Sequence, residues 1–148
     1  MFKRILVATD GSALSEQAVA KAIELSLLTG AELLAVTVAH LEAHSYFEGL
    51  TVLNQRETEE AQHRLTAAAQ NTVDAVKAAA LAKGVCNAEA VVIKSNLVAE
   101  SIVDLAKARA CDLIVMASRG RRGVTRLLMG SETLHVLTHT HTPVLVLR

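Results

Sequence analysis

The sequence has very few aromatic residues: two phenylalanines, one tyrosine and no tryptophan, although 51% of its 148 residues are hydrophobic. The core must therefore be built from Val, Leu, Ile and Ala, which suits helices packed on a sheet. No apolar run approaches the roughly 20 residues of a membrane-spanning helix. The run after Lys3 and Arg4 is too short for the core of a signal peptide. These absences predict a soluble, cytoplasmic protein that does not bind a membrane.

The sequence also has no excess of positive or negative charge, because 15 basic residues balance 15 acidic ones. Without a net field, nucleic acid is not an expected partner. The two cysteines, Cys86 and Cys111, form no CxxC pair, and we expect both to be small core residues rather than redox or metal groups. The length is that of one domain, so residues 1–148 are expected to form a single domain.

Five short apolar segments alternate with helical patterns along the chain. Strands are predicted at 5–8, 33–38, 90–93, 113–116 and 144–147. Helices are predicted from the Ser12 cap to Gly30, from Asn54 to Lys83, from Ser95 or Asn96 to about Arg109, and over 131–137, with a surface loop at 40–53. The first helix should bury Leu14, Ala18, Ala22, Leu25 and Leu28. Unbroken apolar strands between amphipathic helices predict an α/β fold, a single-domain open parallel five-stranded sheet, doubly wound and Rossmann-like.

Two strand ends have the composition of a ligand site. In a doubly wound sheet, ligands bind beyond the carboxyl ends of the strands, where the strand order reverses. Residues 8–12 (Ala-Thr-Asp-Gly-Ser) follow the first strand. After the fourth strand, glycines permit close backbone approach, and Gly130-Ser131 opens a helix whose unpaired N–H groups favour an anion. This pattern indicates a phosphate site, but a solvated turn followed by an ordinary helix cap would give the same pattern. The glycines and arginines concerned are Gly120, Gly123, Gly130, Arg119, Arg121, Arg122 and Arg126.

Common catalytic signatures are missing from the sequence. There is no GxxxxGK[ST], no GxGxxG after a strand, and no SGGxDS at residues 9–13. No nucleophile is paired with a recognisable general base, so no catalytic residue is predicted. His135 and His139 are four residues apart but lack the glutamate of HExxH, and no metal site is predicted.

Residues 116–131 (MASRGRRGVTRLLMGS) strongly resemble the universal stress protein (UspA-like) family. Residues 5–12 (ILVATDGS), 111–116 (CDLIVM) and 143–147 (PVLVL) support the resemblance, which covers essentially the whole chain. It implies the strand order 3-2-1-4-5 and a homodimer formed through the C-terminal strand, Val144 to Leu147. An apolar strand at a sheet edge also favours such pairing. In its nucleotide-binding branch the family carries Gly-x2-Gly-x9-Gly-[Ser/Thr] around the phosphates of ATP.

The resemblance assigns roles to particular positions of this sequence. Gly120, Gly130 and Ser131 match the motif, and Ala117 replaces its first glycine, which we expect to weaken binding rather than abolish it. The Glu132 carboxylate would repel phosphate unless it points away or acts through a metal. The remaining expected contacts are Ala8, Thr9 and Asp10 on the ribose side, backbone of Val38 at the adenine with Met116 nearby, and backbone N–H groups of Glu132 and Thr133.

Three hypotheses follow, in order of preference. In the first, the protein is a stress-response and signalling protein that binds ATP, or ADP or AMP, in the crevice between strands 1 and 4. A bound Mg²⁺ could bridge the phosphate to Asp10. In the second, it is a dimeric interaction protein of the same fold whose pocket stays empty. In the third, it is a slow ATPase.

Overall fold

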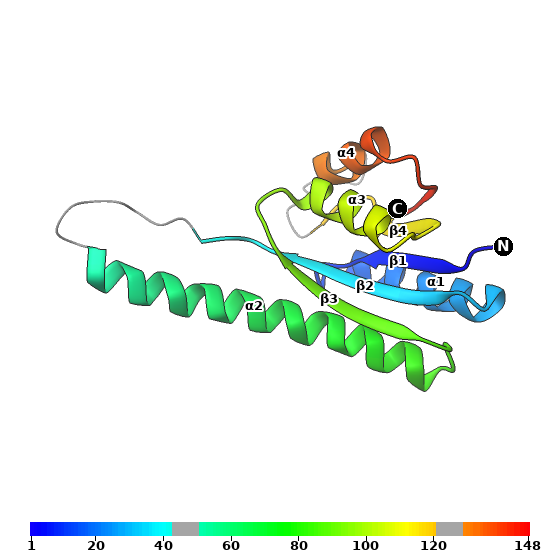
Figure 1. Cartoon of the computed structure of the whole chain (residues 1–148), viewed down its shortest axis with the longest axis horizontal. Helices are drawn as coiled ribbons and strands as arrows, with labels where there is room; N and C mark the ends of the chain where they lie inside the picture. The colour runs from blue at the N-terminus through cyan, green and yellow to red at the C-terminus, as the bar shows by residue number, and fades with distance from the viewer. Residues whose placement is uncertain (43–50, 121–128) are drawn as a thin grey trace.

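A computed structural model describes residues 1–42, 51–120 and 129–148 (Figure 1). All neighbouring strands are parallel, and their order is β3-β2-β1-β4-β5. The predicted α/β sheet and its strand order are therefore confirmed. The elements are β1 Arg4–Ala8, α1 Ala13–Thr29, β2 Glu32–Ala39, α2 Thr51–Ala82, β3 Ala88–Lys94, α3 Val98–Ala108, β4 Leu113–Ala117, α4 Ser131–His139 and β5 Val144–Leu147.

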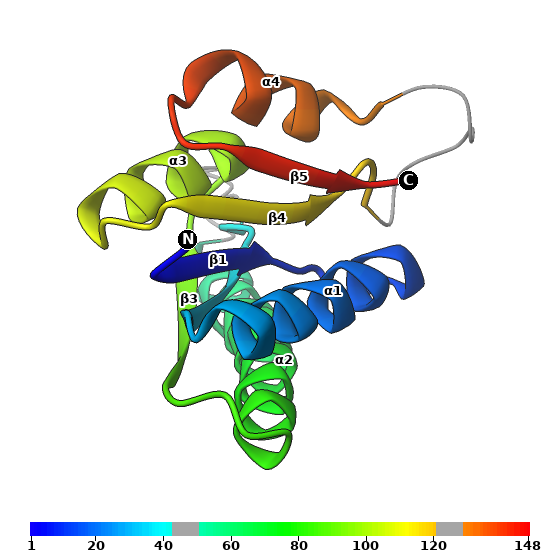
Figure 2. The same cartoon turned by 90° about the vertical axis from the view of Figure 1, so that its right-hand side faces the viewer.

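The sheet is covered on both faces, by α1 and α2 on one side and by α3 and α4 on the other (Figures 1 and 2). Successive residues of a strand point to opposite faces. Ile5 and Val7 of β1 accordingly belong to the core beside α1 and α2, whereas Leu6 belongs to the core beside α3 and α4. All three are fully buried. Burial on both faces explains why the strand sequences are unbroken apolar runs.

Helix α1 has the predicted cap at each end. The Ser12 side chain accepts a hydrogen bond from the Ser15 N–H, and Gly30 ends the helix in the left-handed conformation. The expected apolar stripe is wrong at Leu28, which is 76% exposed. The buried positions are spaced as on one helical face but are mostly small residues, which let the helix approach the sheet closely: Ser15, Ala18, Ala22, Ile23 and Ser26.

Helix α2 begins at Thr51, so the predicted loop over 40–53 is too long at its end and Asn54 lies inside the helix. No glycine or proline lies between Thr51 and Asn54 to oppose the extra turn. In Figure 1 the beginning of α2 extends beyond the sheet, while its second half packs against it. The residues that α2 buries against the sheet are Ala69, Val73, Val76 and Ala80.

Helix α3 starts at Val98, later than the predicted Ser95 or Asn96. Ser95 accepts a hydrogen bond from the Leu97 N–H (2.9 Å), and the Asn96 side chain accepts one from the Leu41 N–H (2.9 Å). The position that caps α3 is Leu97, which has no side-chain hydrogen bond to offer. Helix α4 runs to His139, two residues beyond the predicted end.

The two cysteines differ in their surroundings. Cys111 is buried as expected, and burial raises the pKa of its thiol to about 11. Cys86 is exposed, so the expectation that it belongs to the core is wrong. It follows α2 at the end of the sheet where the strands begin, and its Sγ lies 3.7 Å from the Gly30 carbonyl oxygen.

Among the described residues, Ala110 is the one non-glycine residue with positive φ (52°). It forms the turn from α3 into β4. We expect Ala110→Gly to raise the free energy of unfolding by about 0.5–1 kcal/mol, because relief of the left-handed strain outweighs the added freedom of the unfolded chain. Urea unfolding measures the change. Ala75→Gly, at an exposed position inside α2, should instead cost about 1 kcal/mol. A loss in both variants would contradict the explanation.

In the parts of the chain that the structure describes, no helix combines the length and apolar character needed to cross a membrane.

Candidate functional site

The turn after β1 is held by its own side chains. Gly11 adopts φ 78°, and the Asp10 Oδ1 accepts a hydrogen bond from the Ser12 N–H (2.9 Å). Thr9 is buried, and its hydroxyl accepts from the Gly11 N–H (3.2 Å) and lies 3.0 Å from the Ser15 hydroxyl. The Thr9 side chain is therefore engaged within the turn, while Asp10 is half-buried at the strand end.

Strand β2 supports the same turn through Thr37, a residue that the sequence analysis missed. Its buried hydroxyl donates to the Thr9 carbonyl (2.7 Å), and the Thr9 N–H donates to the Val36 carbonyl (3.0 Å). The next residue, Val38, is half-buried at the end of β2. A hydroxyl within an otherwise apolar strand was the available signal, because a buried hydroxyl needs a hydrogen-bond partner.

Helix α4 begins beside the end of β4. The Gly130 N–H donates to the Ser118 carbonyl (2.7 Å). One turn into the helix, the buried Thr133 hydroxyl donates to the Ala117 carbonyl (2.9 Å). Ser118 in turn donates its N–H to the Leu147 carbonyl of β5. The first turn of α4 is thus fixed against the end of β4.

The β1 turn and the β4 turn meet at Gly120. A Cβ atom added to Gly120 would lie 2.6 Å from Asp10 Oδ2, closer than Cβ atoms come to other atoms in real proteins. Because β1 and β4 are neighbours, this meeting lies where the strand order reverses. The structure therefore brings together Asp10, Gly120 and Gly130, three positions that the sequence predicted as one site.

This close approach predicts that Gly120→Ala destabilises the fold by about 1–2 kcal/mol, because Asp10 must move out of the way of the new methyl group. In an Asp10→Ala background most of that cost should disappear, since Oδ2 is gone. Chemical denaturation of the two single variants and the double variant measures the coupling.

Gly30→Ala serves as the control for this cycle. Its cost comes from the positive φ of 75° and not from a neighbour, because no atom lies within 4 Å of an added Cβ. Its cost should therefore add to that of Asp10→Ala. Additive costs for the Gly120 pair as well would contradict the contact.

Two of the predicted positions, Met116 and Val38, belong to the apolar core near the ends of their strands. The Met116 side chain is buried in the core beside α3 and α4, and Val38 packs at the margin of the same core. Ala117 is also buried and does not have the positive φ that would require glycine, so alanine is sterically compatible there. The remaining strand-end position, Ala8, is half-buried next to Thr9.

The start of α4 presents Ser131 at the surface, directly after Gly130. The carboxylate of Glu132 is bonded elsewhere: its Oε2 accepts a hydrogen bond from the Ala99 N–H in the first turn of α3 (3.0 Å). Of the arginines expected to assist an anion, Arg119 is half-buried beside Gly120. The others, Arg121, Arg122 and Arg126, lie outside the described residues, as does Gly123.

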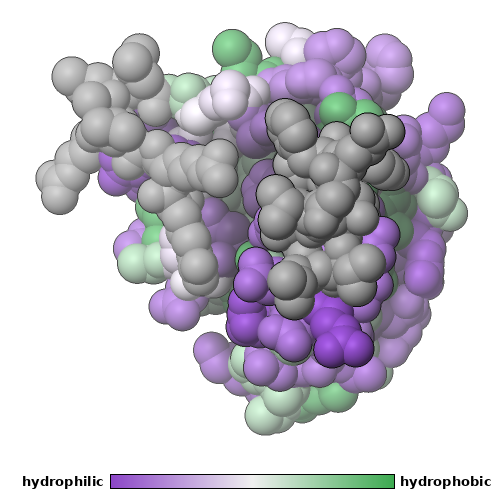
Figure 3. Space-filling model, turned by 90° about the vertical axis from the view of Figure 1, so that its left-hand side faces the viewer, coloured by the Kyte–Doolittle hydropathy of each residue, from purple (hydrophilic) through white to green (hydrophobic). Residues whose placement is uncertain are grey.

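Figure 3 views the side of the molecule toward which β2 and the beginning of α2 point, and its described surface is mostly hydrophilic. Within the described ranges, no group of three His, Cys, Asp or Glu residues could hold a metal ion. His135 instead links α4 to α3, with its Nε2 3.2 Å from the Glu100 carboxylate. Its ring also packs on that of His139, with centroids 4.1 Å apart.

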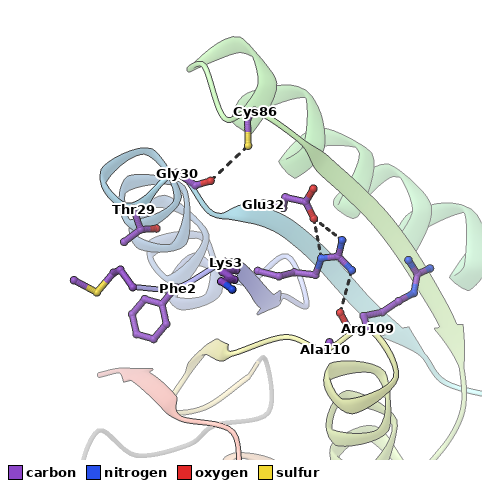
Figure 4. A pocket seen from close by; sticks show the side chains of 10 residues that line it. Phe2, Lys3, Thr29, Gly30, Glu32, Cys86, Arg109 and Ala110 are labelled. Atoms are coloured by element: carbon purple, nitrogen blue, oxygen red, sulfur yellow. Dashed lines mark hydrogen bonds and ion pairs between the residues drawn. The ribbon is translucent and has the colours of Figure 1, made fainter.

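A hollow of about 690 Å³ lies at the opposite end of the sheet, where the strands begin (Figure 4). The Arg4 guanidinium, which lines this hollow, is already bonded. Its Nε donates to Glu32 (2.8 Å), and a terminal nitrogen donates to the Arg109 carbonyl (3.0 Å). The hydrogen bond with Glu32 raises the pKa of Arg4, and the same contact lowers the pKa of Glu32. This guanidinium therefore joins β1, β2 and the end of α3.

Comparisons with known proteins identify the family. The model of the universal stress protein family matches residues 1–148. A universal stress protein of Thermus aquaticus is 35% identical over 149 residues, covering all of both chains. One from Methanocaldococcus jannaschii is 32% identical over 154 residues, covering all of this chain and 83% of the relative.

Solved structures share the fold of this chain. The universal stress protein UspA of Lactobacillus plantarum superposes with a TM-score of 0.84, at 24% identity over 99% of this chain and 97% of that one. Two further universal stress proteins of the same fold were solved with ligands, one in complex with cAMP (TM-score 0.66, 21% identity, covering 99% of this chain and 97% of that one) and one from Archaeoglobus fulgidus with dAMP (0.63, 19%, covering 99% and 98%). From the family match over its whole length, the chain belongs to the universal stress protein family.

Proposed function

We propose that this protein is a cytoplasmic stress-response protein that binds an adenine nucleotide at the switch point between β1 and β4. The observation that supports the site is the meeting of three backbone segments: the β1 turn at Asp10, the β4 turn at Gly120, and the start of α4 at Gly130. Glycine at two of these positions removes the side chains that would otherwise hold the segments apart. Backbone N–H groups at a helix start favour a phosphate.

Each chemical part of a nucleotide has a place in this proposal. The phosphate would lie against Gly120, Gly130 and Ser131, with N–H groups of Glu132 and Thr133. Ala8, Thr9 and Asp10 would line the ribose side of the site. The adenine would lie near the end of β2, at Val38. Bonding of the Glu132 carboxylate to α3 supports a phosphate here, because that charge is already engaged.

The identity of the nucleotide is the finer part of the proposal. ATP, ADP and AMP are candidates, and the ligands seen in the two related complexes, cAMP and dAMP, each carry one phosphate. Mg²⁺ would have to take most of its ligands from phosphate oxygens and water, because Asp10 supplies a single carboxylate.

The deciding experiment is to denature freshly purified protein and analyse the supernatant by chromatography for adenine nucleotides. Titration calorimetry with Mg-ATP, AMP and cAMP then gives the affinity of each. Released nucleotide, or saturable binding of any of the three, would support the proposal. An empty supernatant together with three flat titrations would contradict it.

A dimeric interaction protein without bound nucleotide is the second candidate. Strand β5 lies at the edge of the sheet, and its four apolar residues are only half-buried. Such an edge favours pairing with the same strand of a second copy. Sedimentation velocity would distinguish a dimer from the 15.7 kDa monomer. A dimer with no nucleotide in any preparation would favour this second function.

A further inference from the structure

Helix α3 takes part of its N-terminal cap from another helix. The first N–H groups of a helix have no partner inside it and are usually bonded by the side chain of the cap residue. In α3 that residue is Leu97, whose side chain cannot accept a hydrogen bond. Glu132 of α4, 33 residues further along the chain, supplies the acceptor instead, with Oε2 3.0 Å from the Ala99 nitrogen.

The same glutamate is the second residue of α4, whose first turn belongs to the proposed phosphate site. That turn has two other attachments, both to the end of β4: the Gly130 N–H to the Ser118 carbonyl and the Thr133 hydroxyl to the Ala117 carbonyl. Glu132 adds the attachment to α3. The first turn of α4 is thereby fixed from two different elements of the fold.

We propose that Glu132 is a positioning residue for the phosphate side of the nucleotide site. By capping α3 it fixes the direction of the first turn of α4, and so the N–H groups that would meet the phosphate. Its negative charge is engaged by the N-terminus of α3 and does not compete for the N–H groups of α4. This inference rests on the proposed function.

The test compares Glu132→Ala with Glu132→Gln. Both variants remove the charge, but only glutamine keeps an acceptor for the Ala99 N–H, so their difference isolates the hydrogen bond. We expect the alanine variant to bind AMP about fivefold or more weakly than the glutamine variant in titration calorimetry. Hydrogen exchange of the Gly130 and Leu134 amides, which donate to the Ser118 and Gly130 carbonyls, should also be faster in the alanine variant.

Ser95→Ala is the matched control. It removes the hydrogen bond between the Ser95 side chain and the Leu97 N–H at the entrance to α3, without touching α4. Its AMP affinity should stay within about twofold of the wild type. Equal affinities for the two Glu132 variants would overturn the inference. So would a loss in Ser95→Ala as large as in Glu132→Ala, which would indicate a general loosening of α3.

Failure of the proposed function can be told apart from failure of this inference. If the wild-type protein binds no adenine nucleotide, the proposed function is wrong, and exchange of the hydrogen-bonded Gly130 and Leu134 amides then tests whether Glu132 holds the first turn of α4 in place. Faster exchange in Glu132→Ala than in Glu132→Gln would support the positioning role. Equal exchange in the two variants would overturn it.

Discussion

Replacing Gly130 with valine is expected to abolish nucleotide binding. A Cβ atom at this position would lie 3.2 Å from the Ser118 carbonyl oxygen and 3.3 Å from the Arg119 Cα, and both atoms are backbone. They cannot rotate away as a side chain could, and valine adds two further methyl groups. The start of α4 would have to move away from the end of β4. We expect a stability loss of about 1–3 kcal/mol, with no calorimetric signal for AMP or ATP.

A graded series makes this prediction more specific. Gly130→Ala adds only the Cβ and should weaken binding by less than Gly130→Val does. Met129→Val places the same β-branched side chain one residue earlier, at an exposed position, and should leave binding unchanged. The oligomeric state should be the same in all three variants, because none alters β5. If the valine variant still releases adenine nucleotide on denaturation, the site has been assigned to the wrong place.

Replacing Thr133 with valine is expected to cost about 1–3 kcal/mol in the free energy of unfolding. Valine has nearly the same shape, so the change removes little more than the hydroxyl that donates to the Ala117 carbonyl (2.9 Å). Thr133 is 2% exposed and Ala117 is buried as well, so water cannot readily replace the lost donor. Urea unfolding measures the effect.

Thr138→Val is the control in the same helix. Its hydroxyl is bonded to the Leu134 carbonyl (3.0 Å) but is exposed, so the change should stay within about 0.5 kcal/mol. Similar costs at the two threonines would mean that the buried hydrogen bond does not determine the effect, and that placing valine in this helix is what costs stability.

The fold could be predicted largely from local sequence patterns. Strands buried on both faces must be apolar throughout, and such runs are short and bounded by turns, so β1 and β4 were easy to locate. The caps of α1 were predictable because Ser12 and Gly30 act through neighbouring backbone. Helix starts without a local cap were harder, and both α2 and α3 begin at residues that the capping patterns did not predict.

The errors arise where the outcome depends on distant parts of the chain. The apolar Leu28 was expected to be buried, but it lies on a side of α1 that no other element covers. Cys86 is exposed for a similar reason, at the edge of the hollow in Figure 4. The hydrogen bond from Ala99 to Glu132 left no trace in the sequence, because it joins the starts of two helices that only the fold brings together.

Of the candidate site, composition and spacing predicted which segments carry the ligand-binding residues, and the family resemblance predicted that they meet. Parallel strands place their carboxyl ends at one edge, and the strand order implied by the family resemblance made β1 and β4 neighbours there. The contact between Gly120 and Asp10 and the support from Thr37 required coordinates. The sequence showed the charge of Glu132 but not its direction, and the direction determines whether that charge opposes an anion.

The hydrogen bond between Gly130 and Ser118 has a consequence for how the sequence of such a protein could change in evolution. It holds the two ends of the connection between β4 and α4 together, so the strand and the helix are joined as if by a short turn. Lengthening the connection adds little to the entropy cost of closing it, because that cost grows slowly with the number of residues. Residues between the two ends could then be exchanged, shortened or extended while the framework stays the same, and ligand preference could change without a new fold.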